Sequence, residues 1–585
     1  MKKKIYVLQL ALCFALAPIY AGNKTVSIVG KLPAPIPFGN IRIQGELSTR
    51  LWKNYDRLEE SKYQPDHVFL TEQESGGWPG DTEGRTILGL VMDAQATHRE
   101  PRYLDEIIRR LPSHLNSLGY MGPIYDGMLN EQQLAGNGWL LRGLCEYYKW
   151  KGDNRVLPMI RSIAINLFVK GGKGYEDYPI DPVLRNSQSG GASGNIQKTY
   201  HQWMLSTDIG CVFIGMDGAI QAYDLLRIPE LKKVIDEMVH AFLSMDVVKI
   251  KAQTHATLTA CRGLIRYADI TGNREYVRKV MEIWKLYKTH GMTECYGNYN
   301  WFDRYNTWTE PCAIVDSYML AVQLWQHTGI SAYRDDAELI YYNAIAHAQR
   351  SNGGFGCDNC PGLSAHSSNL NVVIDEASWC CTMRGGEGLA SAARYSYFTC
   401  GHTVYVPFYH ASESVINLPS HQFLSVIQTT TYPFGNGVTF EIKSGNARNV
   451  DLKLASPYWI KPLHIKLNGK ECRYRMSNGF IEVHASFKKG DRLQFSFKPI
   501  VHYENTINQY NTLRKQFRVF YGPLLLGAGN KEKIMELKRG DRLRKMSDCS
   551  FTKQGTDLIL SPIYHLLDPM VSMQYNSKSK QVVFE

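Results

Sequence analysis

The sequence predicts a multidomain α and β protein in which an (α/α) toroid is followed by one or two β-sandwich domains. The first observation is a change in the spacing of apolar residues near residue 398, from three or four residues before it to two after it. The second is a series of helical hairpins in the first part, in units of about 45 to 75 residues. The third is size, because 585 residues, 44% of them hydrophobic, can form more than one core.

The first residues have the composition of a cleaved secretory signal. Three lysines at positions 2–4 precede an apolar run over 5–17, and two small residues at 21–22 follow it. The run is shorter than the ~20 apolar residues that span a bilayer, and no later segment has that character. We therefore expect residues 1–21 to be removed and the mature chain to be exported, without a membrane span, to the periplasm or cell surface of a bacterium.

The helical domain is predicted over residues 61–397. Its stretches, such as "GWLLRGLCEYYKWKGD", repeat apolar residues at three- and four-residue intervals and stop at Gly152, Gly272 and Gly329. Glycine is the usual residue just past the end of a helix. The preceding segment, 22–60, is rich in proline and is expected to be extended and to pack on a β-domain.

The β part is predicted to begin at residue 398. Segments such as "GVTFEIKSG" and "DRLQFSF" alternate apolar and polar residues, and the Asn-Gly pairs at 468–469 and 478–479 mark tight hairpin turns. We expect a β-sandwich over 398–505, and a second sandwich or a C-terminal β extension over 506–585.

The charge of the chain argues against a nucleic-acid partner. The formal net charge is +11, and removal of the three signal lysines leaves +8, spread along the chain without a block of Lys and Arg. Such a balance is compatible with an acidic polysaccharide, although a solvated basic surface is the commoner case.

Four loops between the predicted helices have the composition of a sugar pocket. They combine Tyr and Trp, which stack on sugar rings, with Asn, Asp and Glu, which bind hydroxyls, and they cover residues 74–85, 120–133, 174–182 and 293–312. Together they predict an oligosaccharide or polysaccharide substrate. No sequence feature indicates an oligomeric state.

Cysteines are concentrated in one part of the chain. Twelve remain after the signal, and six of them lie between residues 295 and 381. Disulfides are the default for an exported protein, but such clustering favours a local metal or catalytic site. Glu310, Cys312, Cys380 and Cys381 supply one carboxylate and three thiols, which are ligands that Zn²⁺ accepts in its usual number of four.

Other interpretations of the cysteines remain open. Adjacent cysteines such as Cys380 and Cys381 also occur as ordinary buried or vicinally bridged residues. The "CDNC" segment, with Cys357 and Cys360, has the spacing of half a zinc knuckle or of a redox pair, but a local disulfide is the simpler interpretation.

Three segments resemble one family of enzymes. "TEPCAIVDSYMLAVQLWQHTG", "AELIYYNAIAHAQ" and "WCCTMRGGEGLASAARYSYF" are similar to the core of the β-L-arabinofuranosidase superfamily, glycoside hydrolase families 127 and 146. The resemblance implies an (α/α)6 barrel joined to β-sandwiches. It also implies that zinc is bound by Glu310, Cys312, Cys380 and Cys381.

The resemblance further implies a retaining mechanism. Cys380, the first cysteine of the pair, would be the nucleophile, with its thiolate held by the metal. The acid/base of the family lies sixteen residues before the zinc glutamate, and this position is Glu294. The expected reaction is release of a terminal furanose, β-L-arabinofuranose or a related acidic pectic sugar, from plant glycans.

The chain departs from the family pattern in its expected pocket. Trp139 stands where family members tend to carry a sugar-binding histidine, whereas His255 matches a family histidine. Pro311 and the Thr-Met pair at 382–383 also differ from the usual residues. We expect His255, Trp139 and Asp303 to contact substrate.

Two other functions are compatible with these residues. A metal-independent (α/α) glycosidase or lyase would use Glu294 and Asp303 as its carboxylates and leave the cysteines in the core. A non-catalytic carbohydrate-binding protein would use zinc only as a structural ion. Replacement of Cys380 separates the three, because only the zinc-cysteine enzyme loses all turnover.

Overall fold

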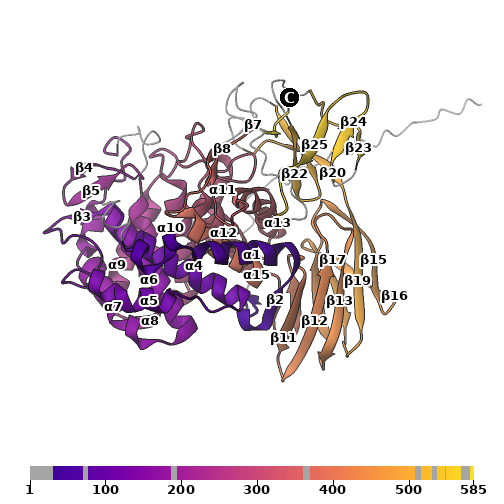
Figure 1. Ribbon diagram of the computed structural model, residues 1–585, viewed down its shortest axis with the longest axis horizontal. Helices are drawn as coiled ribbons and strands as arrows, with labels where there is room; N and C mark the ends of the chain where they lie inside the picture. Colours follow the sequence, from indigo (N-terminus) through magenta and orange to yellow (C-terminus); the bar gives the residue numbers. More distant parts are fainter. Residues whose placement is uncertain are drawn as a thin grey trace, which may run out of the picture.

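The computed structural model describes residues 31–69, 77–185, 194–359, 369–507, 515–529, 536–546, 549–567 and 580–584. Within these ranges a helical domain, on the left of Figure 1, is joined to β-rich domains on the right. The predicted signal over 1–21 and Cys360 lie outside the described residues. Among the described helices, none has the length and apolar character needed to cross a membrane.

Six inner helices form a closed ring, since each packs against the next and the last packs against the first. They are α4 (Asp81–Thr97), α6 (Glu131–Lys151), α8 (Ile214–Leu226), α10 (Thr254–Thr271), α12 (Pro311–Thr328) and α15 (Cys381–Arg394). Outer helices flank them: α1 (Gly45–Leu58), α5 (Leu104–Arg110), α7 (Leu157–Ile163), α9 (Pro229–Ser244), α11 (Glu275–His290) and α13 (Ser331–Ile340). The predicted (α/α)6 toroid is thus confirmed.

Glycines allow neighbouring inner helices to approach closely. A Cβ at Gly84 of α4 would lie 2.3 Å from the backbone of Trp139 and Leu140 on α6. A Cβ at Gly218 of α8 would lie 2.2 Å from the carbonyl oxygen of Gly138 on α6. Real Cβ atoms do not approach backbone atoms so closely, so the spacing of α4, α6 and α8 depends on these residues.

The N-terminal segment is extended only in part. Strand β1 (Ala34–Pro35) joins one sheet of the sandwich and β2 (Ile41–Ile43) joins the other. The prediction of an extended chain is wrong for α1, which is an outer helix. There Leu47, Leu51 and Leu58 recur at helical spacing and are buried, because this stripe packs against the inner helices α4 and α15.

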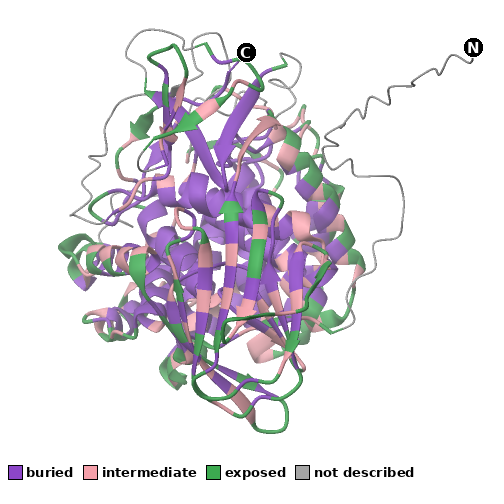
Figure 2. Cartoon of the chain, turned by 90° about the vertical axis from the view of Figure 1, so that its right-hand side faces the viewer, coloured by how far each residue is buried: buried purple, intermediate pink, exposed green. Residues whose placement is uncertain are grey.

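Two sheets, in which most neighbouring strands are antiparallel, form the β-sandwich. One has the strand order β16-β15-β19-β13-β12-β11-β2 and the other β1-β9-β10-β14-β18-β17. The remaining strands of these two sheets, in chain order, are β9 (Phe398–Cys400), β10 (Thr403–Val406), β11 (Ser412–Leu418), β12 (Gln422–Thr430), β13 (Gly437–Gly445), β14 (Val450–Ala455), β15 (Ile460–Leu467), β16 (Lys470–Glu471), β17 (Arg475–Ser477), β18 (Phe480–Ala485) and β19 (Arg492–Pro499). Buried and exposed residues alternate along β11, and Figure 2 shows such striping on the strands that face the viewer.

A third sheet follows the sandwich and has a hydrophobic core of its own, around Phe517, Leu526 and Phe551. Its strand order is β20-β21-β22-β25-β24-β23, with β20 (Val501–Asn505), β21 (Phe517–Tyr521), β22 (Leu524–Gly529), β23 (Leu543–Lys545), β24 (Phe551–Lys553) and β25 (Ile559–Pro562). The short strands β26 (Lys580–Gln581) and β7 (Asn369–Leu370) extend it, so a segment of the helical half pairs with the C-terminal sheet.

Candidate active site

Glu310 and Cys312 lie at the start of α12. Glu310 is the residue before the helix, with extended backbone angles, and Pro311 occupies the first helical position. The Glu310 side chain does not cap its own helix, and its backbone N–H donates to Asn298 Oδ1 at 2.9 Å. The carboxylate is therefore free to point away from the helix, beside the thiol of Cys312.

Cys380 and Cys381 occupy the same place on α15, which packs against α12. Cys380 precedes the helix and Cys381 is its first residue. The two helix starts thus bring the four residues together, although about 70 residues of chain separate the two pairs. Helix N-termini carry partial positive charge, which favours thiolates.

The three sulfur atoms form a compact cluster. Cys312 Sγ lies 3.7 Å and Cys380 Sγ 3.2 Å from Cys381 Sγ. All three lie within 4.8 Å of one another, as do single ligand atoms of His255, Glu310 and Cys312. The two groups share Cys312, so this residue links the three-sulfur cluster to Glu310 and His255.

His255, on α10, lies between two carboxylates. Its Nδ1 is 3.0 Å from Glu310 Oε1 and its Nε2 is 3.5 Å from Asp316 Oδ2. Burial alone would lower the pKa of His255, but the carboxylate of Glu310 outweighs burial and raises it. His255 thus orients Glu310, as a second-sphere histidine or carboxylate does at many metal sites.

Arg85, on α4, is a functional candidate that the sequence analysis missed. Its Nη1 donates to Cys312 Sγ at 3.2 Å, and its Nε donates to Asp81 Oδ2 at 2.8 Å. Burial opposes ionisation of Cys312, but hydrogen bonds from Cys380 and Cys381, together with Arg85, hold its pKa well below the ordinary value. Arg85 and Asp81 end the loop 74–85, whose composition already indicated a binding role.

Beneath the cluster, the centre of the ring holds a buried ionic network. Asp316 pairs with Arg262 and Arg384 at 2.5 Å each, and Glu387 pairs with Arg142 at 2.6 Å. Each inner helix contributes a buried charge to this region: Arg85, Arg142, Asp217, Arg262, Asp316, Arg384 and Glu387. These ion pairs hold in place the buried side chains that pack next to His255 and the thiol cluster.

Trp139 lies at the centre of the ring beside this network, and the expectation that it contacts substrate stays a prediction. It is fully buried, with 0% of its surface exposed, and its ring stacks on His255 with centroids 5.7 Å apart. Arg85, Arg142 and Arg384 lie over its ring at 4.2, 4.9 and 4.5 Å. The ring is held by cations and His255 rather than by a surface open to sugar.

Glu294 lies on the turn that precedes Asn298 and is fully buried. Its Oε2 accepts from the backbone N–H of Ile507 at 2.8 Å and lies 3.4 Å from Nε of Arg518. The turn is closed by a bond from Thr293 N to Gly297 O, and Asn298 then binds Glu310. Glu294 is thus tied both to the metal-ligand segment and to the C-terminal sheet.

Asp303 contributes to a different local structure. It has a left-handed backbone angle, φ 56°, and accepts from Tyr305 at 2.5 Å, while His290 Nδ1 at the end of α11 lies 2.9 Å away. These contacts close the C-terminal end of α11. The structure therefore does not bring Asp303 into the thiol cluster.

Cys357 lies beside the cluster. Strand β6 (Cys357–Asp358) runs next to Thr309, whose N–H donates to Asp358 O at 2.8 Å, and burial together with the neighbouring Cys312, Cys357 and Cys380 thiols raises the pKa of Cys381. Cys357 is a buried free thiol, and the local disulfide favoured by its spacing stays a prediction because its partner is not described. Its neighbour in sequence, Cys360, is outside the described residues.

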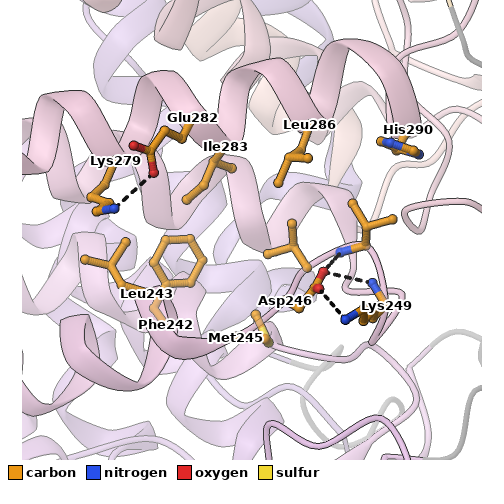
Figure 3. Close-up of a pocket in the computed structure, with 12 residues that line it drawn as sticks. Phe242, Leu243, Met245, Asp246, Lys249, Lys279, Glu282, Ile283, Leu286 and His290 are labelled. Carbon is orange, nitrogen blue, oxygen red and sulfur yellow. Dashed lines mark hydrogen bonds and ion pairs between the residues drawn. The ribbon is translucent and has the colours of Figure 1, made fainter. Parts of the chain in front are cut away.

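A separate pocket lies between the outer helices α9 and α11 (Figure 3). Its volume is about 440 Å³, and it is lined by apolar residues such as Phe242, Met245 and Ile283 with charged residues at its edge. None of the predicted site residues lines it, so it is not the candidate active site.

The donors at the cluster fit a zinc ion. Glu310 Oε2 is buried and has no hydrogen-bond partner among the described residues, while a Glu310 oxygen lies within 4.8 Å of Cys312, which belongs to the cluster of three thiols. A buried carboxylate oxygen without a partner is costly unless a cation or proton occupies the site. One carboxylate and three thiolates form a four-ligand set of the kind that zinc accepts.

Comparisons with known proteins indicate a family for two segments of the chain. Residues 233–394 match the profile described as Beta-L-arabinofuranosidase, GH127 catalytic domain, and residues 403–499 match the GH127 middle domain. The catalytic match includes His255, Glu294, Glu310, Cys312, Cys380 and Cys381. No curated protein matches the chain.

Solved structures share the fold over nearly the whole chain. A GH127 β-arabinofuranosidase has a TM-score of 0.69 and 14% identity, with 95% of this chain and 98% of that chain covered. A GH127 β-L-arabinofuranosidase from Geobacillus stearothermophilus T6 has a TM-score of 0.67 and 13% identity, with 93% and 100% covered. The catalytic and middle domains of this chain, residues 233–394 and 403–499, thus match those of the GH127 β-L-arabinofuranosidase family of glycoside hydrolases, and the fold of nearly the whole chain is similar to that of the solved GH127 structures.

Proposed function

We propose that the chain is a zinc-dependent retaining glycosidase in which Cys380 is the nucleophile and Glu294 the acid/base. The observation that carries the proposal is the meeting of Glu310, Cys312, Cys380 and Cys381 at the adjoining starts of α12 and α15. A bound zinc would keep the thiols deprotonated at neutral pH. The proposed substrate is a glycan that ends in β-L-arabinofuranose or a related acidic furanose.

Exposure favours Cys380 over its neighbours as nucleophile. Cys312 and Cys381 are buried, whereas Cys380 is only partly buried. Cys381 also contacts the sulfurs of Cys312, Cys380 and Cys357, and Cys312 accepts from Arg85. Cys380 is thus the most exposed of the three cysteines, while the other two are held by surrounding groups.

The reaction then follows the two-step logic of retaining glycosidases. The Cys380 thiolate attacks the anomeric carbon while protonated Glu294 gives its proton to the departing glycosidic oxygen. Glu294, now a carboxylate, removes a proton from water, and the water displaces the sugar from Cys380. The net result is hydrolysis with retention of the anomeric configuration.

The metal-independent alternative needs Glu294 and Asp303 as a pair across the substrate. Asp303 instead contacts His290 and Tyr305 at the end of α11. Replacement of Asp303 by Ala tests the pair directly, because an inverting enzyme would lose turnover with it.

The N-terminal signal supports export of the enzyme to the periplasm or cell surface, where plant glycans are met. Secretion with loss of residues 1–21, checked by the N-terminal sequence of the mature protein, is the expected outcome.

The test combines metal content with turnover. Protein purified under reducing conditions and without chelator should contain about one zinc per chain, and Glu310→Ala/Cys312→Ala should lose it. Cys380→Ala should abolish hydrolysis of an aryl β-L-arabinofuranoside. Cys261→Ala, which removes another buried thiol from α10, is the matched control and should remain active. Absence of zinc from the wild type, or full activity of Cys380→Ala, would show that the mechanism is wrong.

A further inference from the structure

The C-terminal sheet reaches the proposed acid/base directly. Arg518 of β21 donates from Nη1 to the carbonyl oxygen of Glu294 at 2.9 Å, and its Nε lies 3.4 Å from Glu294 Oε2. Ile507, just after β20, donates its N–H to the same Oε2 at 2.8 Å. These residues lie outside both segments that match the family profiles, which cover 233–394 and 403–499.

Arg518 is itself rigidly held. Only 2% of its surface is exposed, and its Nη2 donates to Asn505 O at 3.0 Å. The rings of Tyr296 and Phe520 lie 5.0 and 5.2 Å from its guanidinium carbon. These contacts hold the planar guanidinium group of Arg518 in one position. Because that group also binds Glu294, it fixes the position of the turn that carries Glu294.

A second carboxylate shares the same guanidinium. Glu504 Oε2 lies 3.3 Å from Nη2 of Arg518, and Tyr458 and His502 contact the other oxygen of Glu504. Burial opposes ionisation of Glu504, but hydrogen bonding from His502 and the charge of Arg518 lower its pKa to about 2. Glu504 is therefore charged at any working pH.

This arrangement suits a carboxyl group that must gain and lose a proton in each cycle. If Glu294 were the sole partner of Arg518, its protonation would leave a buried cation uncompensated, which is costly. With Glu504 permanently charged, Arg518 keeps a counterion in both protonation states of Glu294. The titratable neighbours on the same turn, Cys295 and Tyr296, are kept neutral because burial raises the pKa of each.

We propose that Arg518, with Glu504 as its counterion, is a positioning residue for Glu294, so that the C-terminal sheet completes the active site. The inference rests on the proposed function of Glu294 as acid/base. It predicts that changes to Arg518 and Glu504 impair proton donation to the leaving group and leave attack by the nucleophile largely intact.

The experiment compares two substrates that share the sugar and differ in leaving group. A dinitrophenyl β-L-arabinofuranoside leaves without protonation, whereas the methyl glycoside needs an acid. Glu294→Gln measures the effect of losing the general acid. It should lower kcat/KM by about 10² to 10⁴ on the methyl glycoside and only slightly on the aryl one. Arg518→Met should lose at least tenfold more activity on the methyl glycoside than on the aryl one, and Arg518→Lys should recover part of that difference. Arg544→Met, an exposed arginine on β23 of the same sheet, is the control and should behave as wild type.

The pH profile on the methyl glycoside gives an independent readout. Arg518→Met removes the cation that favours charged Glu294, so the basic limb of kcat/KM should move to higher pH. Glu504→Gln leaves Glu294 as the remaining carboxylate partner of Arg518, so the limb should move to lower pH. If Arg518 and Glu504 had a merely structural role, their two variants would not shift the basic limb in opposite directions. If Arg518→Met does not fold, the shift in Glu504→Gln still tests the inference.

Equal losses on both substrates in the Arg518 variants, with unshifted pH limbs, would overturn the inference while Glu294→Gln still shows its leaving-group dependence. If Glu294→Gln shows no such dependence, or the wild type hydrolyses neither glycoside, the proposed function itself is wrong and the inference falls with it.

Discussion

His255 Nδ1 lies 3.0 Å from Glu310 Oε1, while the other ring nitrogen of His255 faces Asp316 at 3.5 Å. The imidazole therefore connects the proposed metal carboxylate to the ionic network at the centre of the ring. Because Asp316 is also bound by Arg262, Arg384 and Thr259, it is fixed, and it fixes the ring of His255 in turn.

His255→Ala should weaken zinc binding by about 10- to 100-fold, because removal of a partner that orients a metal ligand typically has this effect. The affinity is measured by competition with a chromogenic chelator. His327→Ala, at a buried histidine near the far end of α12, is the control and should bind zinc as the wild type does. Equal affinities of the His255 variant and the wild type would mean that Glu310 needs no such support.

Cys357→Ala should keep one zinc per chain but release it more readily, with affinity lower by about tenfold or more. Burial, with Cys357 among the neighbouring thiols, raises the pKa of Cys381. Cys357 itself is not among the three sulfurs that lie within 4.8 Å of one another, so we expect it to support a ligand instead of being one. Elemental analysis and chelator competition separate the two roles. A loss of stoichiometric zinc would instead identify Cys357 as a ligand.

Gly84→Ala should lower the free energy of unfolding by about 1 to 3 kcal/mol, since overpacking of a tight contact typically has this cost. The new methyl group would meet the backbone of Trp139 and Leu140 at 2.3 Å, which pushes α4 and α6 apart beneath His255. Denaturant unfolding measures the change. Gly39→Ala, where a Cβ meets nothing within 4 Å, should be neutral or slightly stabilising.

Acid should remove the stability that Asp217 contributes. Burial opposes its ionisation, but Arg266 and Arg142 lower the pKa of Asp217 to about 2, below the ordinary 3.8. A depressed pKa stabilises the fold above pH ~4, and this contribution, of about 2 kcal/mol, is lost as pH falls towards 2. The difference in unfolding free energy between wild type and Asp217→Asn should therefore shrink below pH 4.

The comparison for Asp217 uses urea unfolding at several pH values, with Asp451→Asn as the control at an exposed position on β14. A difference between wild type and Asp217→Asn that stays constant down to pH 2 would contradict the assigned role of the arginines. At neutral pH, Asp217→Asn should be clearly destabilised, by about 3 to 5 kcal/mol, because it leaves buried cationic partners uncompensated.

Local patterns in the sequence predicted the elements of this fold well. Helical spacing and the stops at Gly152, Gly272 and Gly329 correspond to the ends of α6, α10 and α12, each with a left-handed glycine. The exception is α1, whose helical stripe was overlooked beside a proline-rich stretch. The pairing of Glu310 with Cys312 could also be anticipated, since both lie within one turn at the start of a helix.

Contacts between distant segments were harder to predict. Arg85 is 227 residues from Cys312 and Arg518 is 224 from Glu294, so neither contact leaves a local pattern. The surroundings of Trp139 could not be predicted, because sequence does not show that three arginines from different helices meet over its ring. The contact of Asp303 with His290, made from a left-handed backbone position, could not be predicted either.

The ionic network at the centre of the ring limits how this architecture can change in evolution. An open array of helical hairpins can gain or lose a unit, because each unit needs only its neighbours. Here five of the inner helices, α6, α8, α10, α12 and α15, each contribute a buried charge that is balanced by charges from other helices. Deletion or duplication of one hairpin would leave an ion without its partner in the protein interior. The number of hairpins is therefore fixed by charge balance as well as by geometry, and new specificities are expected to arise in the connecting loops.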